Sequence, residues 1–330
     1  MVWACMDPLF LFLIVLLFML GAVVGSFLNV VIYRLPRGES ISHPRSHCPR
    51  CGLTLAAADL VPMLSWVLLR GRCRSCGIRI SPRYFAIELL TALLFVSAYL
   101  SHSFTSNSPD LVWAMSTLIH NLVLIALFVP MIFIDQELKI VPDELSAPLF
   151  VIGLLWNVAS GVTGHEWMVT LATHGSDNLF DLSLPTSLVF ATICAGIFWL
   201  IQWFGEIAFR KEAMGLGDVN IAAGIGANFP LIHALCSFGI AIGVGAIVGV
   251  FLIVIRKREK TDQLAFGPML LAGALFMMLA PHPIEQGIQA YRSRLSPVSA
   301  VSAVPRDRDA TSSLPSSNEI RGGVPSSLST

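Results

Sequence analysis

Charged side chains are scarce in this sequence. Aspartate, glutamate, lysine and arginine make up 13% of its 330 residues, whereas 55% are hydrophobic. Soluble globular proteins carry roughly 25% charged residues, so this balance argues against a soluble domain and predicts a membrane protein. The formal net charge is zero and excludes nothing by itself. The positions of the few charges are therefore more informative than their sum.

Charges are nearly absent from eight apolar runs. A membrane helix needs roughly 17 to 25 predominantly apolar residues, and most of these runs reach that length. They span residues 9–32, 84–100, 111–134, 144–160, 186–204, 219–229, 231–255 and 264–280. The run at 219–229 is short for a crossing. We predict an all-α polytopic membrane protein with about eight transmembrane helices.

Basic residues are missing from every second loop between these runs. Nine arginines lie in the first loop, residues 34–83. The later odd-numbered loops hold Lys139, Arg210, Lys211, Arg256, Lys257, Arg258 and Lys260. Because cytoplasmic loops are enriched in lysine and arginine, we expect the odd-numbered loops to be cytoplasmic and both termini to lie on the far side. The first eight residues have no basic residue, so we expect the first helix to remain as an anchor.

Cysteine is also rare, but four of the seven cysteines lie in the first loop. They form two Cys-x-x-Cys pairs, each followed by glycine: Cys48 and Cys51 before Gly52, and Cys73 and Cys76 before Gly77. Four thiolates at this spacing are typical of a tetrahedral zinc site. A disulfide is disfavoured in a cytoplasmic loop, and a redox pair would not need duplication. With no free coordination position, the zinc is expected to be structural.

One carboxylate, Asp218, lies at the mouth of a predicted membrane helix. It follows Gly215 and Gly217 and precedes the apolar run 219–229. An ionisable group at the membrane boundary is costly unless partnered or solvated, which makes Asp218 a candidate functional residue. The two glycines have no Cβ, so a substrate backbone can approach closely beside the aspartate. The simpler alternative is an aspartate that the helix dipole stabilises.

A second carboxylate, Asp135, ends the run at 111–134. It is predicted to lie at the same depth and on the same side as Asp218, and a helix C-terminus disfavours an anion, so its position needs another reason. Asp143 instead follows Pro142 in the first turn of the next helix, where acidic residues are common, and we interpret it as structural. Asn29 in the first helix is interpreted as a helix-packing residue.

These motifs together resemble one family, the type 4 prepilin peptidases, which are bacterial inner-membrane aspartic proteases of the Gly-x-Gly-Asp class. The resemblance rests on residues 25–36 (GSFLNVVIYRLP), the four cysteines, Asp135 with Pro142 and Asp143, and residues 215–218 (GLGD). Residues 64–66 (LSW), 87–90 (IELL) and 266–268 (FGP) look like further family blocks. One departure touches the presumed site: Asn220 stands where the family usually has lysine.

The resemblance implies two reactions at the cytoplasmic side of the inner membrane. Asp135 and Asp218 would cleave the basic leader from type IV prepilins or type II secretion pseudopilins, and the new N-terminus would be methylated with S-adenosylmethionine. The sequence has no glycine-rich nucleotide fingerprint, so it predicts no methyl-donor site. The expected partners are these precursors and the lipid bilayer, and no nucleic acid.

A different class of function remains open, a non-enzymatic transporter or assembly scaffold with a structural zinc loop. Transport would favour carboxylates near the bilayer midplane and repeated halves, and the sequence indicates neither. The predicted organisation is a first transmembrane helix (1–33), a cytoplasmic zinc loop (34–83), a seven-helix peptidase core (84–282) and a tail rich in serine and proline (283–330). The composition of the tail predicts disorder.

Overall fold

The structure is a computed structural model that describes residues 8–105, 111–162, 168–170, 183–209, 215–254 and 265–280. The chain divides into two compact units, Met1–Pro281 and His282–Thr330. The second unit contains the predicted disordered tail, which lies outside the described residues. The division into four segments and the side on which each loop lies stay predictions.

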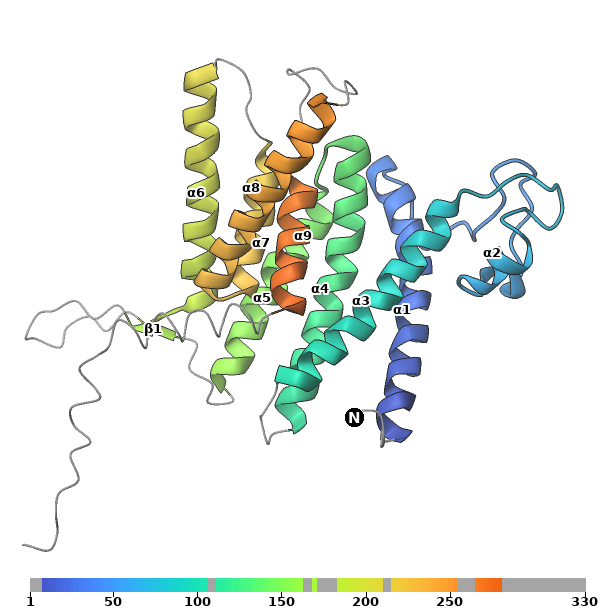
Figure 1. The fold of residues 1–330 in the computed structure, drawn as a ribbon, viewed down its shortest axis with the longest axis horizontal. Helices are drawn as coiled ribbons and strands as arrows, with labels where there is room; N and C mark the ends of the chain where they lie inside the picture. Colours follow the sequence, from blue (N-terminus) through green and yellow to red (C-terminus); the bar gives the residue numbers. More distant parts are fainter. Residues whose placement is uncertain are drawn as a thin grey trace, which may run out of the picture. The chain divides into compact units, whose positions relative to one another are not determined.

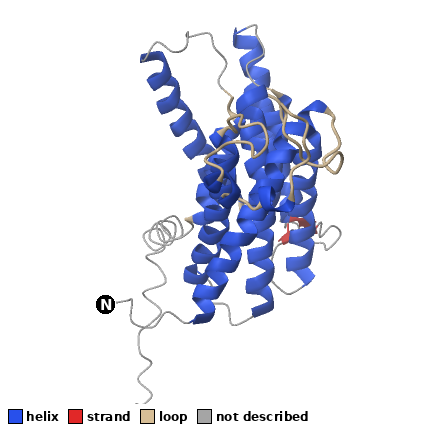
Figure 2. Ribbon diagram, turned by 90° about the vertical axis from the view of Figure 1, so that its right-hand side faces the viewer, coloured by secondary structure: helices blue, strands red, loops and turns tan. Residues whose placement is uncertain are grey.

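Each of the eight predicted apolar runs forms a helix (Figure 1). These helices are α1 (Pro8–Arg34), α3 (Pro82–Thr105), α4 (Leu111–Leu138), α5 (Asp143–Val162), α6 (Thr186–Phe209), α7 (Leu216–Asn228), α8 (Leu231–Val254) and α9 (Gly267–Leu279). The described part of the chain is therefore an almost entirely helical protein, as predicted. Figure 2 shows how small the strand content beside these helices is.

The prediction of eight membrane crossings is not confirmed. Among the described residues, six helices are long and apolar enough to cross a membrane, namely α1, α3, α4, α5, α6 and α8. Helices α7 and α9 have 13 residues each. At about 1.5 Å per residue such a helix extends about 20 Å, which is less than the roughly 30 Å of the hydrocarbon core. The two short helices instead bring their ends to the site described below.

Helices α1 and α3 pack closely because α1 presents glycine to its neighbour. A Cβ added to Gly25 would lie 2.8 Å from the Cα of Glu88, so only glycine permits this approach. Asn29 donates a hydrogen bond from Nδ2 to the backbone oxygen of Tyr84 on α3, at 3.2 Å. The predicted packing role of Asn29 is therefore correct.

Glycines also allow α7 to pack closely between α5 and α6. A Cβ on Gly224 would lie 2.6 Å from Leu149 Cδ2 of α5, and one on Gly226 would lie 2.6 Å from the carbonyl oxygen of Phe190 of α6. At the end of α7, Asn228 donates a hydrogen bond to the Leu149 carbonyl oxygen at 2.9 Å and interacts with His120 Nε2 at 3.0 Å. These contacts fix the position of α7, and with it the position of Asp218.

The core of the bundle lies around α4. Leu124, Ile125, Phe128 and Val129 of this helix are completely buried. Many large apolar side chains on the outer faces of α1, α6 and α8 are exposed, as expected for helices that face lipid.

The remaining elements are short. The first loop contains the 3-10 helices η1 (Leu35–Arg37) and η2 (Ala57–Leu60) and the α-helix α2 (Leu64–Leu68). Strands β1 (Met168–Thr170) and β2 (Ser183–Pro185) form an antiparallel pair with Met168 opposite Pro185. This pair was not predicted from the sequence.

Candidate active site and metal centre

Asp135 lies in the last turn of α4 and is 5% exposed. Its Oδ2 atom is buried and has no hydrogen-bond partner among the described residues. A buried carboxylate oxygen without a partner is unfavourable, and such groups are common at functional sites. The chemistry of Asp135 therefore depends on what lies opposite Oδ2.

Asp218 is the third residue of α7 and is half-buried. The helix begins after Gly215, whose extended backbone makes it the N-cap residue, and the Asp218 N–H donates to the Gly215 oxygen at 3.1 Å. A carboxylate in the first turn is stabilised by the partial positive charge of the helix N-terminus. The alternative that the helix dipole stabilises Asp218 therefore agrees with its place in the helix. That alternative does not explain which groups face its carboxylate.

The two aspartates meet at Gly267, the first residue of α9. A Cβ added to Gly267 would overlap Asp135 Oδ2 and would lie 3.2 Å from Asp218 Oδ1. Helices α4, α7 and α9 thus bring two carboxylates to one point, and the absence of a side chain on Gly267 provides the space for them.

Gly267 was not predicted as a site residue. Residues 266–268 (FGP) were recognised only as a sequence block at the start of a helix on the same predicted side as the aspartates. Their predicted location on the same side as the aspartates was the only indication in the sequence that they could contribute to the site. The contact with both carboxylates depends on how α9 packs between α4 and α8, which the sequence does not specify.

Asp143 makes a different contact. It is the first residue of α5, its side chain is exposed, and its Oδ1 accepts a hydrogen bond from Asn220 Nδ2 at 3.4 Å. Its place in the first turn of a helix agrees with the structural interpretation.

The two glycines before Asp218 have different surroundings. Gly215 is exposed, and a Cβ there would meet only the Gly217 nitrogen, at 3.9 Å. A Cβ on Gly217 would lie 2.8 Å from Val141 Cβ, in the segment between α4 and α5. Close packing against Val141 therefore explains the glycine at position 217, whereas Gly215 has no such contact among the described residues.

The four predicted cysteine ligands come together in the first loop. The sulfur atoms of Cys48, Cys51, Cys73 and Cys76 all lie within 4.8 Å of one another, and Cys48 Sγ and Cys76 Sγ are 3.7 Å apart. Tetrahedral zinc with Zn–S bonds of about 2.3 Å requires sulfur atoms about 3.8 Å apart. The donor set and its spacing therefore fit this metal.

The two cysteine pairs lie in equivalent turns. Cys48 N–H donates to Leu53 O at 3.0 Å and Gly52 N–H to Cys48 O at 2.9 Å. In the second pair, Cys73 N–H donates to Ile78 O at 2.9 Å and Gly77 N–H to Cys73 O at 3.0 Å. Gly52 and Gly77 both have φ of 69°, a conformation that favours glycine. Each turn thus aims two sulfurs at a common centre.

Thiol acidity in the cluster is uneven. Backbone hydrogen bonds from Cys51 and Arg50 lower the pKa of the Cys48 thiol to about 6. At Cys76 a backbone hydrogen bond from Ile78 also favours the thiolate, but desolvation and the neighbouring thiols outweigh it and raise the pKa to about 11. Four sulfurs this close cannot all ionise without a cation between them, so a divalent metal would complement the cluster.

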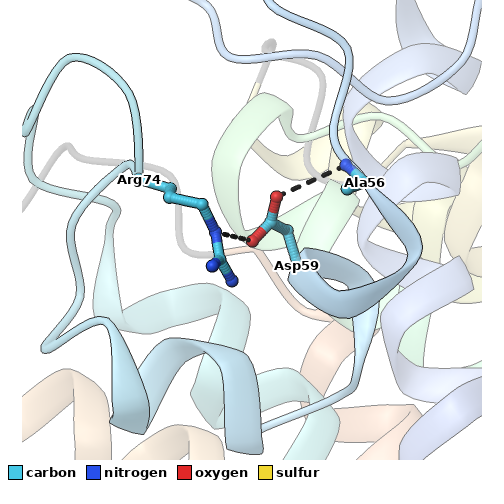
Figure 3. Close-up of polar contacts among 3 residues, drawn as sticks. All are labelled: Ala56, Asp59 and Arg74. Atoms are coloured by element: carbon cyan, nitrogen blue, oxygen red, sulfur yellow. Dashed lines mark hydrogen bonds and ion pairs between the residues drawn. The ribbon is translucent and has the colours of Figure 1, made fainter.

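Two contacts hold the first loop together, and a third joins it to α3. Figure 3 shows Asp59 of η2, whose Oδ1 lies 2.7 Å from Arg74 Nε in the second turn. The Met63 N–H donates to Glu88 Oε2 of α3 at 2.7 Å, and Trp66 Nε1 donates to the Ile80 oxygen at 3.3 Å. The loop is thereby attached directly to a membrane helix.

Comparison with known proteins places the chain in a family. Residues 19–102 match the bacterial Peptidase A24 N-terminal domain, and residues 122–250 match the type IV leader peptidase family. A "Prepilin leader peptidase/N-methyltransferase" of Aeromonas hydrophila is 32% identical over 80% of this chain and 89% of its own length. The chain belongs to the type IV leader peptidase family.

Two further relatives agree with this assignment. A "Prepilin leader peptidase/N-methyltransferase" of Myxococcus xanthus is 37% identical over 76% of this chain and 66% of its own length. A "Type 4 prepilin-like proteins leader peptide-processing enzyme" of Escherichia coli is 34% identical over 77% of this chain and 89% of its own length. No solved structure matches the chain.

Proposed function

We propose that this protein is an intramembrane aspartic endopeptidase that removes the basic leader from type IV prepilins or type II secretion pseudopilins on the cytoplasmic side of the inner membrane. The observation that carries the proposal is the meeting of Asp135 and Asp218 at Gly267. The names of the relatives support prepilins as the substrate class.

The paired carboxylates supply both proton transfers that peptide hydrolysis needs. Two neighbouring carboxylates repel one another when both are ionised, so the pair holds one proton between them. The ionised member takes a proton from water as the water oxygen attacks the scissile carbonyl carbon. The protonated member donates to the carbonyl oxygen, and collapse of the tetrahedral species passes a proton to the leaving nitrogen. The reaction then needs no covalent intermediate.

Surrounding residues hold this pair in position. Gly267 lies against both carboxylates, and the contacts of α7 with α5 and α6 fix the helix that carries Asp218. Oδ2 of Asp135 is buried and has no hydrogen-bond partner among the described residues, so it keeps its capacity to bind a water or a substrate atom that enters the site. Gly215 is exposed and has no side chain, which favours the approach of an extended substrate backbone at this end of α7.

Zinc has a structural role in this proposal. Cys48, Cys51, Cys73 and Cys76 would hold one ion, and four protein ligands leave no position for water or substrate. The ion would stabilise the turns of the first loop and contribute no step to hydrolysis.

The proposal extends to N-methylation of the new N-terminus with S-adenosylmethionine, because the Aeromonas and Myxococcus relatives carry N-methyltransferase in their names. The donor is polar and charged. Among the described residues, two cavities, one lined by α5, α6 and α7 and one around Trp156 and Asn228, have no charged side chain in their linings. No residue is therefore assigned to the donor.

Cleavage of a prepilin by membranes that contain single variants tests the peptidase proposal. Asp135→Asn and Asp218→Asn should each abolish cleavage while the protein still inserts into the membrane. Asp143→Asn is the matched control and should retain substantial activity, because its carboxylate is exposed and bound to Asn220. Inactive Asp143→Asn together with active Asp135→Asn would show that the pair is wrongly assigned.

A further inference from the structure

Helices α6 and α7 pack closely near the end of α7. A Cβ on Gly226, near the end of α7, would lie 2.6 Å from the Phe190 oxygen and 2.9 Å from the Ala191 Cα of α6. Further along α6, a Cβ on Gly196 would meet no atom of the described residues within 4 Å. A groove lined by residues of α5, α6 and α7, Gly196 among them, lies on this side of α6.

This groove has a volume of about 430 Å³. Helix α6 lines it with Leu188, Ala191, Thr192, Ala195, Gly196 and Trp199. Helix α7 contributes Val219 and Ala223, and α5 contributes Phe150. The one polar side chain in this lining, Thr192, donates its hydroxyl hydrogen to the Leu188 oxygen of its own helix at 2.8 Å. The groove therefore suits an apolar occupant.

The groove begins beside the candidate active site. Val219 in its lining directly follows Asp218 in the chain, and Ala223 lies one helical turn further along α7. Gly215, the N-cap residue, lies at the same end of α7. The groove therefore adjoins the end of α7 that carries Asp218.

Small residues give the α6 wall a shape that fits a helix. Ala191 and Ala195 are four residues apart, as are Thr192 and Gly196, so these pairs lie one turn apart along one side of α6. Small residues four apart allow a second helix to approach closely within a membrane. Trp199 borders the same groove and adds a large apolar surface.

We propose that the substrate has an apolar membrane-spanning helix and that this groove binds that helix, next to the bond that is cleaved. The inference rests on the proposed function and specifies how that function selects its substrate. The basic leader stays outside the groove, the segment near the cleaved bond is extended past Gly215, and the apolar helix packs against α6 and α7.

Filling the groove should affect two kinds of substrate differently. Gly196→Leu places a side chain in the groove without overlap, because no atom lies within 4 Å of the Cβ position. The matched control is Gly243→Leu on α8, which is exposed and has equally open surroundings. Each variant is assayed with a full-length prepilin in proteoliposomes and with a soluble peptide that ends a few residues beyond the cleaved bond.

Gly196→Leu should raise KM for the full-length prepilin at least about tenfold and change cleavage of the short peptide less than about twofold. Gly243→Leu should resemble the wild type with both substrates. Unchanged cleavage of the full-length substrate by Gly196→Leu would overturn the inference and indicate that membrane lipid fills the groove. An equal loss with both substrates would also overturn it, because the effect would then arise at the aspartates.

A crosslinking experiment gives a result even if Gly196→Leu does not insert. A photoreactive benzoylphenylalanine replaces Trp199 in the inactive Asp218→Asn protein, and full-length prepilin is added. Crosslinks should form to the apolar segment of the prepilin. As a control, benzoylphenylalanine in place of Ile247, an exposed residue of α8, should form no crosslink. No crosslink from position 199 would overturn the inference. Failure of the wild type to cleave either substrate would instead contradict the proposed function.

Discussion

Gly267 and Asp135 are so close that the glycine has no room for a side chain. A Cβ on Gly267 would overlap Asp135 Oδ2 and would also contact Asp218 Oδ1 at 3.2 Å. Gly267 thus sets the space between the two carboxylates without contributing a side chain.

Gly267→Ala should therefore greatly reduce peptide cleavage. The added methyl group has to displace Asp135 or separate it from Asp218, and proton sharing depends on their closeness. We expect a loss of about 100-fold in kcat, about 2.7 kcal/mol in the barrier. The measurement is turnover of a fluorescent precursor peptide. Gly239→Ala on α8, where no atom lies within 4 Å of the Cβ position, is the control and should retain activity.

Gly217→Ala should lose activity for a packing reason. Its Cβ would lie 2.8 Å from both Val141 Cβ and Val141 Cγ2, so the start of α7 would have to shift and carry Asp218 with it. The second substitution Val141→Gly removes those atoms and should restore much of the cleavage rate. Rates and membrane insertion are compared in the two single variants and the double variant. If Val141→Gly gives no rescue, Gly217 instead serves the approach of the substrate, as the sequence alone suggested.

The sequence permitted a good account of the helices and of which residues matter, but not of how they meet. Apolar run length located eight helices, and the four-cysteine spacing predicted a cluster whose sulfurs indeed lie together. Run length did not predict that the helices in 219–229 and 264–280 are too short to cross a membrane. Small residues such as Gly224 and Gly273 allow these short helices to pack closely inside the bundle. Equal depth suggested that Asp135 and Asp218 are paired. The role of Gly267 depends on packing between segments that are distant in the sequence, so no periodic pattern in the sequence predicts it.

Asn220→Lys should change cleavage only modestly. Asn220 is exposed and donates to the exposed carboxylate of Asp143 at 3.4 Å, so it lies outside the pair of aspartates. A lysine would replace this contact with an exposed ion pair, which contributes about 0 to 1 kcal/mol. We expect kcat/KM to stay within about tenfold, or about 1.4 kcal/mol in barrier. Asn220→Gln keeps the amide and serves as the control. A much larger change in Asn220→Lys alone would show that this position contacts the substrate.

The purified protein should contain one zinc ion per chain, bound by the four cysteines. Cys73→Ser should lose the ion, because Cys73 is one of two sulfurs in its turn and three thiolates bind zinc more weakly than four. Cys194→Ser is the matched control and should keep the ion, because Cys194 is a buried residue of α6 outside the cluster. Metal analysis and thiol alkylation measure both outcomes.

Loss of zinc should disturb the first loop before it affects the chemistry. The metal site has no open position for water, and the loop is attached to α3 through Met63 and Glu88 rather than to the aspartates. Limited proteolysis of Cys73→Ser should therefore show faster cutting within residues 34–83, while cleavage of the short precursor peptide by intact protein continues. Absence of zinc from the wild type, with all four thiols freely alkylated, would contradict the metal site. An immediate and complete loss of peptide cleavage on zinc removal, with the loop still resistant to protease, would contradict its structural role.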